Sequence, residues 1–176
     1  MNRIALDTRL PETLQALAAS LAEHLVDYAD WALQAMSQDG WDVSLLLVDD
    51  GFIAELNQTW RGKAGPTDVL SFEQAEWYSE IGGERRFLAG DIVIALPAVW
   101  RNATEFGVGF IQELHRVLIH GLLHLSGLDH AGNEAAEPML QRQETILAAL
   151  PDWTGWVTDL EALKVAALAL HGGWST

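Results

Sequence analysis

Three histidines lie within one short segment at a spacing that suits a metal ion: His120, His124 and His130, in the run HGLLHLSGLDH. His120 and His124 are four residues apart, so a helix places both imidazoles on one face, one turn apart. Gly127 follows where a helix can end and the chain can turn back, which brings His130 towards the same point. Three neutral nitrogen ligands leave a tetrahedral Zn²⁺ with one open position, as in catalytic zinc sites. We therefore predict one zinc ion per chain, bound by these three histidines.

The order H-x3-H-x2-G-x2-H is also the ligand spacing of the metzincin zinc peptidases, HExxHxxGxxH, but one essential residue of those enzymes is missing. Gly121 stands where they have the glutamate that serves as general base, which weakens the interpretation as a peptidase. Asp129 directly precedes the third ligand, and two roles are open for its side chain. It could accept a hydrogen bond from the N–H of a metal-binding histidine and so orient the ring, or it could stabilise the turn. Glu113 lies seven residues before His120, and we expect it to be a solvated charge. The other three histidines are expected to have packing or solvated roles.

A second group of candidate residues lies upstream, in the segment LNQTWRGKAGPTDVLSF. Arg61 and Lys63 stand there in a loop rich in glycine and proline that leads into a predicted strand. The planar guanidinium of an arginine can bind a phosphate through two parallel hydrogen bonds, which makes Arg61, with Lys63 near it, a candidate phosphate-binding residue. The alternative for either is an ordinary solvent-exposed loop charge.

The periodicity of the apolar residues predicts the elements that must position these side chains. Helices are expected at residues 11–38, 52–60, 97–106, 111–126, 134–150 and 160–171, and strands at residues 43–48, 67–72 and 89–95. The polar, glycine-containing residues 74–86 are expected to form a flexible connection. Because the strands do not alternate strictly with helices, we predict an α+β fold in which a small mixed β-sheet packs with five or six helices. Residues 1–176 are expected to form a single domain, with a catalytic core at about 40–150 and a C-terminal extension at 151–176.

Composition restricts the possible functions further. Ten lysines and arginines stand against 25 acidic residues, giving a net charge of −15. A histone-like wrapper or a non-specific DNA coat is excluded, because affinity for a phosphate backbone depends on cationic side chains. Six of the ten basic residues lie between residues 58 and 120, so we expect a local basic cleft beside the first metal ligand. The chain lacks cysteine, a secretory signal pattern and a long apolar stretch, and we expect a cytoplasmic protein without membrane contact.

Three motifs occur together in one order: LNxxxRxKxxPTDVLSF at residues 56–72, GDIVI at 90–94 and HGxLHLxGxDH at 120–130. In these motifs the sequence resembles the YbeY endoribonucleases, the bacterial rRNA maturation factors. The resemblance implies a zincin-like fold, zinc on His120, His124 and His130, an important role for Arg61, and metal-dependent cleavage of single-stranded RNA. It also implies 16S rRNA 3′-end maturation and ribosome quality control, with the small ribosomal subunit and its assembly proteins as partners.

Our hypothesis from the sequence is that Arg61 stabilises the negative charge that grows on the phosphate during cleavage, beside a zinc ion acting as Lewis acid. Two alternatives remain, a zinc metallopeptidase and a non-catalytic ribosome assembly factor that the metal only stabilises. The acidic total charge predicts weak non-specific affinity for RNA, and therefore delivery to the substrate by a ribosomal or protein partner.

Overall fold

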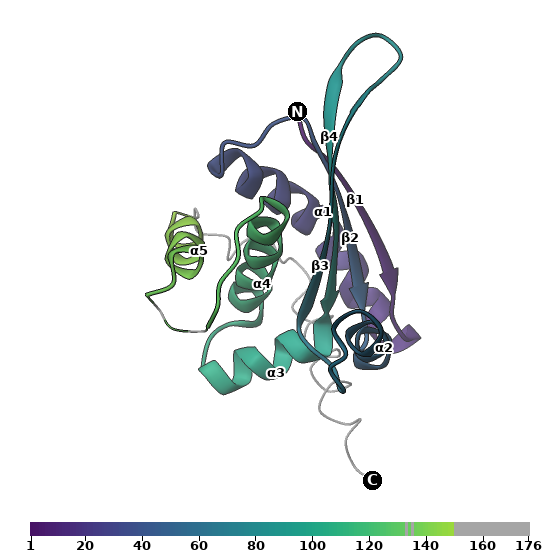
Figure 1. The fold of residues 1–176 in the computed structure, drawn as a ribbon. Coiled ribbons are helices and arrows are strands. Elements are labelled where there is room, and N and C mark those ends of the chain that lie inside the picture. The colour runs from purple at the N-terminus through teal and green to yellow at the C-terminus, as the bar shows by residue number, and fades with distance from the viewer. Residues whose placement is uncertain (133, 135, 150–176) are drawn as a thin grey trace.

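The protein is built on a four-stranded mixed β-sheet, seen in a computed structural model that describes residues 1–132, 134 and 136–149 (Figure 1). The strands are β1 (Arg3–Arg9), β2 (Trp41–Val48), β3 (Val69–Ser79) and β4 (Arg85–Ala95). Their spatial order is β1-β2-β4-β3, in which β2 runs parallel to both β1 and β4, whereas β3 is antiparallel to β4. One edge of the sheet is therefore β3, the strand that follows the predicted phosphate-binding loop.

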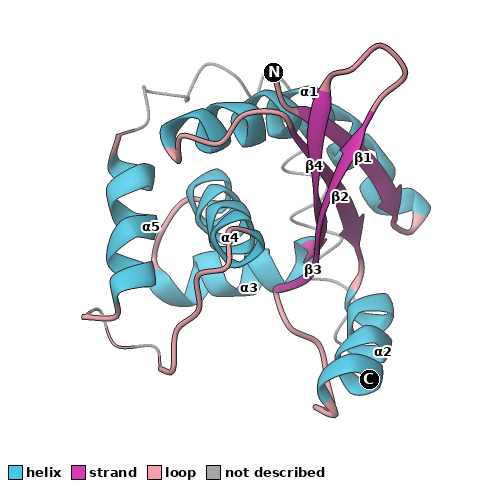
Figure 2. Cartoon of the chain, turned by 45° about the horizontal axis from the view of Figure 1, so that its top comes forward, coloured by secondary structure: helices cyan, strands magenta, loops and turns pink. Residues whose placement is uncertain are grey.

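Helices cover both faces of this sheet. Within the described residues they are α1 (Glu12–Ala35), α2 (Asp50–Arg61), α3 (Leu96–Phe106), α4 (Phe110–Leu125) and α5 (Pro138–Ala148). Helices α1 and α4 pack on one face, α2 lies on the other, and α5 runs beside α4 (Figures 1 and 2). The α+β architecture predicted from the sequence is confirmed. None of the helices in the described part of the chain is both long and apolar enough to cross a bilayer.

The alternation of side chains along β4 separates two hydrophobic cores. Ile92 and Ile94 are fully buried among the apolar residues of α1 and α4, while Val93, between them, points towards α2. This is the period of two that a strand with both faces covered requires. The larger core holds α4 against the sheet, and α4 is the helix that carries the first two metal ligands of the predicted site.

The sequence-based prediction for residues 74–86 is wrong, since most of this segment extends β3 and β4 into a long hairpin. Trp77 pairs with Phe87 across the two strands, with ring centroids 5.0 Å apart, and the Arg85 guanidinium lies 4.5 Å from the Trp77 ring centroid. These cross-strand contacts stabilise a segment whose polar composition alone indicates a loop. Strand β1 was not predicted either, and the predicted helix at 160–171 lies outside the described residues.

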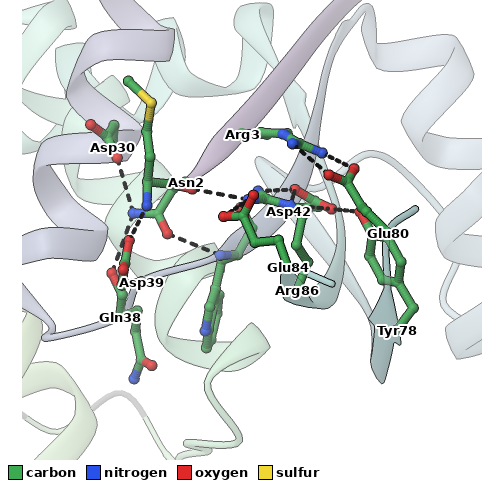
Figure 3. A network of polar contacts seen from close by, with 12 residues as sticks. Asn2, Arg3, Asp30, Gln38, Asp39, Asp42, Tyr78, Glu80, Glu84 and Arg86 are labelled. Carbon is green, nitrogen blue, oxygen red and sulfur yellow. Dashed lines mark hydrogen bonds and ion pairs between the residues drawn. The ribbon is translucent and has the colours of Figure 1, made fainter. Parts of the chain in front are cut away.

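A buried arginine holds the hairpin to the rest of the sheet (Figure 3). Arg86 is 1% exposed, and its Nε donates a hydrogen bond to Asp42 on β2 at 2.9 Å. It also donates to the main-chain carbonyls of Met1 and Trp41, and the Tyr78 hydroxyl donates to the same Asp42 carboxylate. Partial burial acts to raise the pKa of Asp42, but the hydrogen bonds from Arg86 and Tyr78 outweigh it, so the pKa lies below its ordinary value. Arg86 is therefore a structural cation.

Candidate metal centre

The structure brings His120, His124 and His130 together. The first two project from the last turns of α4, and His130 lies on the segment that returns after this helix. The Nε2 atom of His120 is 3.1 Å from that of His124 and 3.4 Å from that of His130. Within the described residues these three form the group whose ligand atoms could hold a metal ion, all within 4.8 Å of one another. We call this group the histidine cluster.

A glycine in the left-handed region makes the return of the chain possible. Gly127 has φ +80°, and its N–H donates to the carbonyl of His124 at 2.9 Å. The N–H of Leu128 then donates to the carbonyl of Leu123 at 3.2 Å, which closes the end of α4. A residue with a side chain would be strained at this φ, so the sharp turn towards His130 depends on Gly127.

The outward nitrogen of each ring in the histidine cluster bonds to a carbonyl oxygen. The partners of the Nδ1 atoms are Gln143 Oε1 for His120 at 2.8 Å, the main-chain oxygen of Leu128 for His124 at 3.1 Å and that of Gly132 for His130 at 2.7 Å. A carbonyl oxygen only accepts, so each Nδ1 carries the proton and each Nε2 presents its lone pair to the centre. Three lone pairs that face one another suit a cation between them, and this donor set fits zinc or a neighbouring late transition metal.

Burial also keeps the ligands in the form that binds metal. Desolvation lowers the pKa of His120, against the hydrogen bond that the ring donates to Gln143, which acts to raise it. Desolvation likewise lowers the pKa of His124. Because both pKa values fall below the ordinary value of 6.5, these imidazoles are neutral near pH 7 and need not lose a proton to coordinate a cation.

Gln143 was missed by the sequence analysis, although it contacts a predicted ligand directly. It is 6% exposed and shares the buried face of α5 with Met139, Ile146 and Leu147. A polar residue in the middle of an apolar helix face was the available signal. Its Nε2 atom donates to Glu144 at 3.0 Å, which fixes the amide so that Oε1 points to His120.

The two acidic residues considered in the sequence analysis have different surroundings. The side chain of Asp129 is 88% exposed, and its Oδ1 accepts from the His130 N–H at 2.8 Å but lies 3.8 Å from the Nδ1 of His124. It stabilises the turn, while the Leu128 carbonyl accepts from His124. The expectation of a solvated Glu113 is wrong, since it is 2% exposed and pairs with Arg116 at 2.6 Å.

The helix face at Gly121 explains why a peptidase-type glutamate does not fit here. A Cβ atom on Gly121 would lie 2.8 Å from Ile92 Cγ2 and 3.2 Å from the Ser71 hydroxyl. Helix α4 therefore lies against the sheet at this point, and a longer side chain would displace β3 or β4. The general base of the zinc peptidases is absent from the sequence, and the packing excludes it from this position.

A cavity of about 710 Å³ opens in front of the histidine cluster, and Arg61 and Lys63 line it. Arg61 is the last residue of α2, and Gly62 caps the helix in the left-handed conformation. The loop that follows is held at both ends. The buried Asn57 donates from Nδ2 to the Gly65 carbonyl at 2.9 Å, and Asp68 accepts from Asn102 on α3 at 3.0 Å. The side chains of Arg61, at the end of α2, and of Lys63, on the anchored loop, thus line the cavity beside the cluster.

The other basic residues of the middle segment do not join this cavity, so the predicted basic cleft is smaller than expected. They are engaged elsewhere: Arg85 on Trp77, Arg86 with Asp42, Arg101 with Asp50 and Arg116 with Glu113 and Glu144. The cavity instead combines Arg61 and Lys63 with the acidic Asp68, Glu73 and Asp129. Its capacity to bind a phosphate depends on two cations and a bound metal rather than on a broad basic surface.

Comparison with known proteins agrees with these observations. A family model described as endoribonuclease YbeY matches residues 7–151. The endoribonuclease YbeY of Treponema denticola is 49% identical over 115 residues, which cover 65% of this chain and 74% of that protein. That of Pelotomaculum thermopropionicum is 36% identical over 149 residues, 85% of this chain and 91% of that protein. The solution structure of TM1509 from Thermotoga maritima covers 84% of this chain and 87% of its own, with 32% identity and a TM-score of 0.49. Since the family match extends over most of its length, the chain belongs to the endoribonuclease YbeY family.

Proposed function

We propose that the protein is a zinc-dependent endoribonuclease that cleaves single-stranded RNA at the histidine cluster. The observation that carries this proposal is the convergence of three Nε2 lone pairs beside a cavity lined by Arg61. Membership of the endoribonuclease YbeY family supports the choice of RNA as substrate. We also propose that the chain is a single domain with a catalytic core at about residues 40–150. All residues of the site, of which Arg61 is the first and Gln143 the last in sequence, lie within this core.

The residues of the chain have distinct tasks in this proposal. His120, His124 and His130 would hold the zinc ion, which when bound supplies Lewis-acid chemistry at a phosphate. Arg61 binds the scissile phosphate through its guanidinium and stabilises the negative charge that develops as the bond to the leaving oxygen breaks. Lys63, on the anchored loop that follows α2, adds a second positive charge and contacts the RNA backbone.

The net charge bears on the biological setting. A chain with a charge of −15 repels RNA away from Arg61, Lys63 and the metal site, so its non-specific affinity is expected to be low. We propose that the enzyme acts in the cytoplasm on 16S rRNA, in 3′-end maturation and ribosome quality control, where the small ribosomal subunit and its assembly proteins deliver the substrate. Tight, salt-insensitive binding of free RNA to the isolated protein would contradict delivery by a partner.

The proposal is tested by cleavage of one oligoribonucleotide, single-stranded and annealed to its complement, by wild type and variants. His120→Ala should abolish cleavage, and Arg61→Ala should reduce the rate by about 10²–10³, the usual cost of losing one donor to a developing anion. Arg85→Ala is the matched control, because it removes an exposed arginine that lies on the hairpin rather than at the cavity. Undiminished cleavage by both His120→Ala and Arg61→Ala would refute the proposal.

RNA cleavage, protein unfolding and peptide hydrolysis together separate the two alternative functions. A non-catalytic assembly factor predicts that wild type cleaves no RNA with any divalent metal, while His120→Ala lowers the free energy of unfolding of the metal-loaded protein. A peptidase predicts hydrolysis of an unstructured peptide by the zinc-loaded protein. The packing around Gly121 argues against that activity, since it leaves no space for the glutamate general base.

A further inference from the structure

A second, apolar cavity lies next to the cavity at the histidine cluster. Its volume is about 1020 Å³, and we call it the apolar groove. It shares four lining residues with the first cavity, namely Arg61, Leu70, Ser71 and Glu73. The shared residues lie at the end of α2 and on the edge strand β3, so a ligand that leaves the metal cavity past Arg61 enters the apolar groove.

The groove lies on the α2 face of the sheet. Along β3, Ser71 bonds to the Gly121 carbonyl of α4 at 3.4 Å, whereas the next residue, Phe72, contacts Trp60 of α2. Alternate side chains of the edge strand therefore point to opposite faces of the sheet, and Phe72 points to the α2 face. Much of the apolar lining belongs to the smaller core between α2 and the sheet: Leu46, Phe52, Leu56 and Val93.

Trp60 is the most exposed aromatic residue of this groove. It is 68% exposed, although a tryptophan normally buries most of its surface. Its ring makes an edge contact with Phe72, with centroids 5.8 Å apart and an interplanar angle of 71°. Trp60 also directly precedes Arg61 in the last turn of α2. An indole ring is thus held beside the residue that we propose binds the scissile phosphate.

The charges around the groove indicate which part of an RNA strand it would accept. Asp7, Glu73 and Asp91 line it, and among the described residues that line it Arg61 is the single cation. Acidic side chains repel phosphates, so a row of backbone contacts does not fit here. Bases are uncharged and stack on aromatic rings, and stacking is a source of affinity that does not require positive charge. In a chain with a net charge of −15, such a contribution is needed.

We propose that Trp60, supported by Phe72, is a stacking subsite for a nucleobase adjacent to the scissile phosphate. The inference rests on the proposed function, because it assumes that the substrate is single-stranded RNA. The RNA strand crosses the edge strand β3 beside Arg61. Its scissile phosphate then lies in the metal cavity and a neighbouring base in the apolar groove. A duplex holds its bases stacked inside the helix, so this subsite would also favour single strands.

The test is steady-state cleavage of a short single-stranded oligoribonucleotide by wild type, Trp60→Ala and Trp60→Phe. Trp60→Ala should raise KM by about 5- to 150-fold, the effect of losing one stacked base, with kcat changed less than twofold. Trp60→Phe keeps an aromatic face and should recover most of the affinity. Trp77→Ala is the matched control, since Trp77 is 52% exposed but lies on the hairpin, outside the lining of both cavities.

A second substrate series identifies the base. Abasic nucleotides placed one at a time around the cleavage site should raise the KM of wild type at one position, and Trp60→Ala should be insensitive at that same position. Equal KM values for wild type and Trp60→Ala, with Arg61→Ala impaired, would overturn the stacking subsite alone. An effect of Trp60→Ala confined to RNA within ribosomal particles would assign the groove to a protein partner and also overturn it. Absence of cleavage by wild type would overturn the proposed function and the subsite together.

Discussion

Gln143→Met tests the hydrogen bond that we infer to set the tautomer of a metal ligand. Methionine has a similar length but offers no carbonyl oxygen, so the Nδ1 proton of His120 loses its acceptor at 2.8 Å. The ring can then place its proton on Nε2, which blocks the lone pair that faces the cluster. Because Gln143 is 6% exposed, water does not readily replace the lost acceptor.

The size of the effect follows from this burial. Leaving a buried donor unsatisfied costs about 1–3 kcal/mol, which corresponds to roughly 5- to 150-fold in a dissociation constant. We therefore expect the apparent Kd for Zn²⁺ to rise by about 10- to 100-fold, the range usual for residues that orient a metal ligand. The assay is competition with a chromophoric chelator at pH 7.5.

Gln141→Met is the matched control for this prediction. It makes the same substitution on the exposed face of α5, and its Kd should equal that of wild type. Urea unfolding of the metal-free variants checks that Gln143→Met still folds. An unchanged Kd for a folded Gln143→Met protein would refute the reasoning, as would an equal loss of affinity in Gln141→Met.

Three further predictions concern stability. Asp42→Ala removes the carboxylate that accepts the hydrogen bonds of the buried Arg86 and leaves it only the longer ion pair with Glu84 at 3.6 Å. It should lower the free energy of unfolding by about 3 kcal/mol in urea, and a change below about 1 kcal/mol would contradict the structural role of the Arg86–Asp42 pair. Burial lowers the pKa of His115 to about 3 and lowers that of His24, which lies 2.7 Å from it, so the folded state favours their neutral forms. The free energy of unfolding should therefore fall as the pH drops below about 6.5, where the histidines of the unfolded chain take up protons. His115→Phe should make this fall shallower between pH 7 and pH 4, as measured by urea titrations at several pH values. An unchanged slope would contradict a neutral, buried His115. Gly121→Glu should lower the free energy of unfolding by roughly 3 kcal/mol and yield no hydrolysis of an unstructured peptide, whereas a stable, proteolytic variant would show that the packing had been misread.

The parts of the site that the sequence predicted are those encoded by local spacing. A separation of four residues on a helix fixes the relation of His120 to His124, and Gly127 indicates the turn that returns His130. The loop that begins after Arg61 was likewise predictable from its glycine and proline residues, although Arg61 itself is the last residue of α2. Tertiary contacts could not be predicted in this way, since the Gln143 amide reaches His120 from another helix. The spacing of residues within one segment does not reveal a contact between two helices.

The errors in the predicted strands have a similar physical origin. The outer part of β3 is largely exposed on both faces, and it is held by pairing with β4 rather than by burial in a core. Strand β1 does alternate between half-buried and exposed residues, but it is short and lies at the other edge of the sheet. Edge strands depend on partners that are distant in sequence, so a single segment indicates them weakly.

The central claim is that the histidine cluster holds the metal on which RNA cleavage depends, and a metal titration tests it most directly. Protein stripped by a chelator is supplied with increasing Zn²⁺, and cleavage of a single-stranded oligoribonucleotide is followed in parallel with bound metal. We predict no cleavage without metal, a rise that ends at one ion per chain, and neither binding nor cleavage by a folded His120→Ala protein. Full cleavage by the stripped protein, or equal cleavage by His120→Ala, would contradict the claim.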